Sequence, residues 1–100
     1  MNYALEDFQK LNQPENIIIT QHSRRRLFER AISILDICEA INNGEIIENY
    51  PDSYLILGHS KSKVIHIVAN IDDEFIYLIT AYTPDPAKWE NDFKTRKEES

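Results

Sequence analysis

The sequence predicts an α+β fold in which N-terminal helices pack on one face of an antiparallel β-meander sheet of about four strands. Apolar residues recur at helical spacing up to Gly44 and alternate with a period of two after it. A chain of 100 residues, 42% of them hydrophobic, can bury one core. We therefore expect one domain over 1–100, with an N-terminal helix and loop (1–16), a core (17–86) and a C-terminal helix with a frayed tail (87–100).

The first thirty residues should form two helices with a strand between them. Apolar residues at helical spacing predict an amphipathic helix over 3–11, and the stretch 12–16, which contains a proline, ends it. The β-branched run Ile17–Ile19 predicts a strand. Thr20 stands at the N-cap of a helix that runs to about Arg30, because its hydroxyl can accept a hydrogen bond from an amide of the first turn.

A third helix should begin after Ser33. Ser33 and Asp36 have the spacing of a capping box, in which each side chain bonds an amide that the first helical turn leaves free. Gly44 should end this helix in the left-handed conformation, which glycine adopts without steric penalty. The core-facing stripe of the helix consists of Ile34, Ile37, Cys38 and Ile41.

The second half of the chain has the pattern of strands. Prolines at 84 and 86 should end the last strand. Trp89 and Phe93 are four residues apart, the spacing of neighbours on a helix face, and this predicts the C-terminal helix. The predicted strands cover 45–50, 54–57, 64–71 and 75–83.

The last two strands should place three chemically useful side chains on one face. If the odd-numbered residues of both strands face the helices, His66, Thr80 and Tyr82 share the opposite face. A three-residue connection over 72–74 would set His66 directly across from Thr80, whereas a two-residue turn would put them on opposite faces. We expect the three-residue connection. The alternative is structural, because Thr and Tyr are good strand formers and a mid-strand histidine is commonly a hydrogen-bonded one.

Composition and motifs exclude several function classes. The net charge of −6 argues against a broad basic surface for nucleic acid. No apolar run approaches the ~20 residues of a membrane span, and no secretory leader is visible, so we expect no membrane contact and a cytoplasmic location. The single cysteine, Cys38, fits a reducing cytoplasm. Metal-ligand spacings, a phosphate-binding glycine loop and a nucleophile elbow are missing, so no metal and no cofactor are expected.

Positive charge is concentrated in 22–31, where four arginines stand against one acid, Glu29, a local charge of +3. A cationic island on an acidic chain suits a localised phosphate site, with Arg25 as a substrate-binding candidate. The alternative is a solvated helix face. The arginines are Arg24, Arg25, Arg26 and Arg30.

Three of these residues form a ridge along one side of the predicted helix. His22, Arg26 and Arg30 are each four residues apart, so successive members are rotated by only about 40°. Histidine can exchange a proton near neutral pH, and the planar guanidinium can bind two phosphate oxygens and stabilise charge that develops on them. The alternative is that His22 or Thr20 caps the helix while the arginines pair with acids.

Ordered segments of the chain resemble the family called domain of unknown function 4258. The resemblance covers about residues 17–97, and it departs from the family pattern at Ser23, Leu27 and Ala31, where the family favours Ala, Met and often Gly. The opening is carried by Ile19-Thr20-Gln21-His22-Ser23, Arg26, Glu29-Arg30, Ile32-Ser33 and Asp36-Ile37. The later pieces are Asn43-Gly44-Glu45-Ile46-Ile47-Glu48, Tyr50-Pro51-Asp52, Leu57-Gly58, His66-Ile67-Val68, Ile79-Thr80-Ala81-Tyr82-Thr83-Pro84-Asp85 and Trp89-Glu90.

The resemblance implies a fold similar to RelE-type and barnase-like toxin ribonucleases, and an antitoxin protein as partner. It implies metal-independent RNA cleavage, free or on the ribosome, in which the ribose 2′-hydroxyl attacks the adjacent phosphorus, a histidine acts as base or acid, and arginines stabilise the charge. The implied catalytic residues are His22, Arg26, Arg30, His66 and Thr80, with Tyr82 in substrate binding.

Three functions therefore stand beside one another. The first is a ribonuclease toxin held by an antitoxin. The second is an interaction module that keeps the fold without the chemistry, and the third is a binder of phosphate or nucleotides without turnover. Growth arrest and RNA cleavage would be seen only for the first, and saturable, salt-sensitive ligand binding without turnover only for the third.

Overall fold

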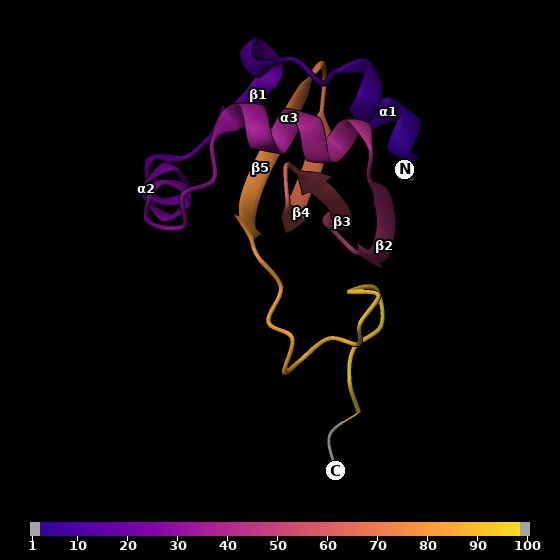
Figure 1. Cartoon of the computed structure of the whole chain (residues 1–100). Helices are drawn as coiled ribbons and strands as arrows, with labels where there is room; N and C mark the ends of the chain where they lie inside the picture. Colours follow the sequence, from indigo (N-terminus) through magenta and orange to yellow (C-terminus); the bar gives the residue numbers. More distant parts are fainter. Residues whose placement is uncertain (1–2, 99–100) are drawn as a thin grey trace.

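The computed structural model describes residues 3–98 and has the predicted α+β architecture (Figure 1). Its five-stranded sheet has the order β1-β5-β4-β3-β2. Four strands form the predicted antiparallel meander, and β1 is a fifth strand that runs parallel to β5. The strands are β1 (Ile17–Ile19), β2 (Glu45–Tyr50), β3 (Ser53–Ser60), β4 (Lys63–Asp72) and β5 (Phe75–Tyr82).

The helices take two different positions relative to the sheet. Helix α3 lies across one face, whereas α2 lies beside β5, where the short β1 has already ended (Figure 1). The predicted N-caps are confirmed: Thr20 accepts a hydrogen bond from the Ser23 amide, and Ser33 and Asp36 exchange side-chain-to-amide bonds. The helices are α1 (Leu5–Lys10), α2 (Gln21–Glu29) and α3 (Ile34–Asn42), and a 3-10 turn (Pro14–Asn16) precedes β1.

The main core lies between α3 and the sheet face that it covers, which we call the inner face. Ile56 and Ile67 are directly paired across β3 and β4 and are fully buried there. The opposite, outer face carries the alternate residues of each strand, including His66 and Thr80. The core consists mainly of Phe8, Leu27, Ile37, Ala40, Ile41, Ile56, Ile65, Ile67, Ala69, Ile76, Leu78 and Ala81.

The connection between β4 and β5 corrects the predicted register. Asp72 pairs with Phe75, so the turn has two residues instead of three. A β-bulge at Ile79 adds one residue to β5 and restores the parity that the short turn would have reversed. His66 and Thr80 therefore do share the outer face, but His66 lies across from Tyr82, and the prediction that it lies across from Thr80 is wrong.

Gly44 ends α3 for a different reason from the predicted one. No glycine in residues 3–98 has a positive φ, so Gly44 is not a left-handed cap. A Cβ built on Gly44 would lie 2.5 Å from the Ala40 carbonyl oxygen and 2.7 Å from that of Leu57. Glycine is required here because the end of α3 passes very close to β3.

The left-handed helix end belongs to α2, at Ala31. Its φ is 56°, and the amide of Ile32 donates to the Leu27 carbonyl at 3.0 Å, the hydrogen bond that closes a Schellman motif. Because the Cβ of Ala31 opposes this conformation, Ala31→Gly should raise the free energy of unfolding by about 0.5–1 kcal/mol. Urea denaturation measures the change. Ala40→Gly, inside α3, should have the opposite sign, and a loss of stability in Ala31→Gly would contradict the strain.

The segment after β5 does not form the predicted helix. Residues 84–97, the C-terminal segment, make turns and one isolated bridge between Trp89 and Arg96. Trp89 and Phe93 are therefore not neighbours on a helix face. Trp89 is buried against the outer face of the sheet instead, beside His66.

Candidate functional site

A shallow pocket opens between α2 and β5. Its volume is about 230 Å³, and it is lined by His22, Ser23, Arg26, Ile79 and Thr80. Three of the predicted catalytic residues thus meet here, two from the helix and one from the last strand. The ridge of the helix therefore faces the outer side of the sheet at the bulge.

A buried hydroxyl fixes α2 in this position. Ser23 donates a hydrogen bond to the Ile79 carbonyl at 2.8 Å and accepts one from the Thr20 hydroxyl at 3.0 Å. Ile79 is the bulged residue, which a bulge leaves out of the regular ladder, so its carbonyl can accept from a side chain. With Ser23 and Leu27 turned into the protein, His22 and Arg26 are directed to the pocket.

The two ridge arginines differ in what they contact. Arg30 caps α2 and donates from Nη1 to Thr80 Oγ1 at 3.1 Å and to the Ala81 carbonyl at 2.8 Å. Thr80 therefore acts as an acceptor toward Arg30, and its own hydroxyl proton is free to point elsewhere. The side chain of Arg26 makes no hydrogen bond or ion pair with any of residues 3–98, so its guanidinium is available to an anion.

The other helix arginines lie outside this pocket. Arg25 is exposed on α2 and does not line the pocket, so the structure does not bring it to Thr80. Arg24 lines a separate, mostly apolar groove of about 180 Å³. At the rim of that groove Phe28 is 86% exposed, an unusual position for a large apolar side chain. The remaining lining residues are Ile19, Leu27, Ile32, Ser33 and Ile34.

His66 is not in the pocket. It is fully buried, and its Nε2 lies 2.8 Å from the Phe93 carbonyl oxygen, a bond that needs the proton on Nε2. Trp89 and Tyr82 pack edge-on against the ring with centroids at 4.5 Å and 5.4 Å. Within the described chain Nδ1 has no hydrogen-bond partner. Two predicted site residues, His66 and Tyr82, thus form a second cluster beneath the C-terminal segment.

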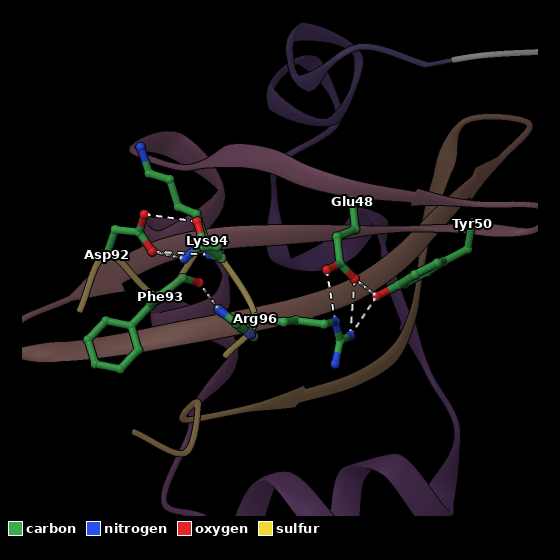
Figure 2. Close-up of polar contacts among 8 residues, drawn as sticks. Glu48, Tyr50, Asp92, Phe93, Lys94 and Arg96 are labelled. Atoms are coloured by element: carbon green, nitrogen blue, oxygen red, sulfur yellow. Dashed lines mark hydrogen bonds and ion pairs between the residues drawn. The ribbon is translucent and has the colours of Figure 1, made fainter. Parts of the chain in front are cut away.

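Ion pairs hold the C-terminal segment on this cluster (Figure 2). The Arg96 guanidinium binds both Glu48 carboxylate oxygens, at 3.0 Å and 3.1 Å, and its Cζ lies 4.6 Å from the centre of the Trp89 ring. Lys94 pairs with Glu45 at 2.6 Å. Both acids belong to β2, so the segment crosses the outer face from β5 to the opposite edge of the sheet.

Burial and these pairs shift the acidities of the cluster. Burial lowers the pKa of His66, although the Phe93 carbonyl and Glu48 oppose the shift, so the imidazole is kept neutral. Hydrogen bonds from Arg96 lower the pKa of Glu48. Burial also raises the pKa of Tyr82. Within the cluster His66 and Trp89 are buried, so the imidazole has no open path to a substrate in this conformation, whereas Tyr82 is half-buried and Arg96 is exposed.

Residues 3–98 contain no group of three His, Cys, Asp or Glu side chains that could together hold a metal ion. In the same part of the chain, no helix has the length and apolar character that crossing a membrane requires.

Sequence reasoning missed the residues that assemble the two clusters. Ser23 is the one polar residue on the buried side of α2, and that position is the signal that could have identified its role. The second cluster depends on the pairing of Arg96 with Glu48, which joins residues 48 positions apart and has no local signature in the sequence.

A protein-family model described as Domain of unknown function (DUF4258) matches residues 19–83. Comparisons with curated proteins and with solved structures gave no match. The matched range contains all the residues that line the α2–β5 pocket, and it ends before the C-terminal segment begins.

Proposed function

The chain belongs to the DUF4258 family, whose description assigns no activity, and we propose that it is a metal-independent RNA endonuclease of the cytoplasm, held inactive by an antitoxin protein. The observation that carries the proposal is the α2–β5 pocket. It combines the exposed imidazole of His22 with the guanidinium of Arg26, which has no partner among residues 3–98. The third group is the Thr80 hydroxyl, which Arg30 orients.

These residues suit cleavage by the 2′-hydroxyl of RNA. His22 takes the proton of the 2′-hydroxyl, the 2′ oxygen bonds to phosphorus, and the bond to the 5′ oxygen breaks, leaving a 2′,3′-cyclic phosphate. The 5′ oxygen receives a proton from water or from the protonated His22. Arg26 stabilises the charge on the phosphate oxygens, and the Thr80 hydroxyl donates a hydrogen bond to one of them. Arg30 is a positioning residue.

The overall charge of −6 does not oppose this site, because the pocket is on the cationic helix. Screening limits each charge to about 8–10 Å at physiological salt, so a phosphate at the pocket responds mainly to the arginines of α2. The acidic remainder of the chain restricts RNA to this region. A single short contact is therefore expected, with a weak dependence of binding on salt.

An interaction module is the second candidate, and the apolar groove beside Phe28 favours it. An exposed phenylalanine next to aliphatic side chains and Arg24 fits an amphipathic segment of another protein that carries an acid. In the ribonuclease proposal the same groove holds the antitoxin. In the module proposal, binding of a partner protein in this groove is the only function of the protein.

Cleavage by purified protein in the presence of EDTA tests the proposal. We expect labelled RNA to be cut to products with a 2′,3′-cyclic phosphate, and the rate to fall about 10²-fold or more in His22→Ala and in Arg26→Ala. His59→Ala is the matched control, because His59 is exposed on β3 away from the pocket. Expression of the wild type, but not of His22→Ala, should arrest growth.

Other outcomes decide between the candidates. Intact RNA with folded wild-type protein would overturn the nuclease and leave the interaction module. Cleavage that disappears with EDTA would contradict a metal-independent mechanism. An equal loss of rate in His59→Ala and His22→Ala would show that the pocket is not the site.

A further inference from the structure

The open half of the outer face carries exposed aromatic and aliphatic side chains next to the pocket. Ile18, Phe75, Tyr77 and Ile79 are between 36% and 49% exposed. The C-terminal segment covers the part of the outer face around His66, where β5 ends. The half that carries these exposed side chains stays uncovered (Figure 1).

Strand register places these side chains on the same side as Thr80. Tyr77 pairs with Asn70 of β4 and Thr80 pairs with Val68, and positions 68 and 70 of one strand share a face. Ile18 of β1 pairs with Tyr77 from the other side, and Phe75 follows two residues before Tyr77. The surface is therefore continuous with the pocket through Ile79, which belongs to both.

We infer that this surface is a stacking platform for the bases of a single-stranded RNA whose phosphate lies in the α2–β5 pocket. The inference rests on the proposed function and specifies its substrate. Tyr77 is within about 10 Å of Thr80 along β5, and Phe75 is about 6.6 Å further on, so bases of neighbouring nucleotides can each reach one ring. Exposed aromatic rings on a sheet bind unpaired bases, whereas bases inside a duplex are covered on both faces.

The charged and polar residues around this surface determine on which side the RNA backbone lies and on which side its bases lie. Arg26 and His22 attract the backbone to the α2 side, while Asp72, paired with Phe75, repels phosphate at the far end. The Asp72 carboxylate and the half-buried Asn70 amide can instead bond the edges of bases. The RNA backbone should therefore stay near α2, with its bases over β5.

Binding of a non-cleavable oligonucleotide separates stacking from chemistry. The probe is a fluorescein-labelled, fully 2′-O-methylated single strand of ten nucleotides, with its binding measured by fluorescence anisotropy. Tyr77→Thr keeps a strand-forming residue but removes the ring, and should weaken binding by between about 5-fold and 150-fold. Tyr77→Phe keeps the ring and should change binding less than twofold. Phe75→Thr is a second variant in case Tyr77→Thr folds poorly.

Salt dependence distinguishes the ring from the arginine. Tyr77→Thr should keep the slope of log affinity against log salt, whereas Arg26→Ala should reduce its magnitude by about 0.7, the value for one phosphate contact on a single strand. The same sequence as a 2′-O-methyl duplex should bind at least tenfold more weakly than the single strand.

Several results would overturn the platform: equal affinities for Tyr77→Thr and Tyr77→Phe, equal binding of duplex and single strand, or no binding of the probe. If RNA is cleaved but Tyr77→Thr binds normally, the platform fails and the nuclease stands. If Tyr77-dependent binding occurs without any cleavage, the platform stands and the nuclease fails. Loss of binding to a partner protein, but not to the probe, in Tyr77→Thr would assign the surface to protein contact instead.

Discussion

Gly58→Ala should lower the free energy of unfolding by about 3 kcal/mol, which for a domain of this size lowers the melting temperature by about 12–24 °C. A Cβ on Gly58 would lie 2.0 Å from the Ala40 carbonyl oxygen and 2.6 Å from its carbon. These are backbone atoms of α3, so no rotamer change relieves the clash and the whole helix must move away from β3.

The sign of the effect makes this a sharp test. In a strand without such a close contact, Gly→Ala raises stability by about 0.5–1 kcal/mol, because alanine has less freedom to lose on folding. Thermal and urea denaturation of Gly58→Ala give the answer. His59→Ala, the exposed neighbour on β3, should stay within about 0.5 kcal/mol of wild type. Unchanged or increased stability in Gly58→Ala would show that α3 does not approach the strand as described.

The fold was predictable where local chemistry determines it. Thr20 and the Ser33–Asp36 pair bond amides within three residues, so their sequence spacing contains the whole interaction. The predicted strands are likewise present because their apolar content suits a sheet buried on one or both faces. The bulge at Ile79 was not predictable, because Ile79 accepts a hydrogen bond from Ser23, 56 residues away in sequence.

The pocket was predictable in part for the same reason. The ridge of His22, Arg26 and Arg30 follows from helical periodicity. Thr80 lies on the predicted face only because the bulge restores the parity, whereas Tyr77, which comes before the bulge, lies on the outer face against the prediction. The division of roles between the two arginines was not visible, because Arg30 stands at the helix end and reaches Thr80 through a tertiary contact. The covering of His66 depends on Phe93 and Trp89, distant residues whose path over the sheet no local pattern specifies.

Trp89→Ala should lower the free energy of unfolding by about 3 kcal/mol at pH 7.5. The tryptophan is 4% exposed, packs on His66, and carries the Arg96 guanidinium on its ring. Its removal takes away a buried aromatic side chain that packs the C-terminal segment onto the sheet. Phe93→Ala is the matched control: the Phe93 backbone carbonyl accepts a hydrogen bond from His66, but its half-buried side chain points away from Arg96 (Figure 2), so a change below about 1 kcal/mol is expected.

The pH dependence of the stability of Trp89→Ala distinguishes two effects of the substitution. It shows whether the C-terminal segment loosens and exposes His66, or whether the substitution only leaves a cavity. The pKa of His66 is lowered in the folded protein, so at neutral pH the imidazole is neutral in both states and no stability is lost. As the pH falls through the ordinary histidine value of about 6.5, the unfolded state gains a proton that the buried ring refuses, and wild-type stability declines toward the lowered pKa. The lowered pKa of Glu48 acts only in a more acidic window, below its ordinary value near 4.5.

If Trp89 keeps water from His66, Trp89→Ala restores an ordinary histidine pKa in the folded state and removes this decline. The stability difference between wild type and Trp89→Ala should then be larger at pH 7.5 than at pH 5.5, and urea titrations at both values measure it. A His66→Gln variant should lose the same pH dependence without losing the tryptophan contact. The prediction would be contradicted if the stability difference between wild type and Trp89→Ala were the same at both pH values and the stability of His66→Gln still declined like that of wild type. His66 would then not be the group that causes the decline.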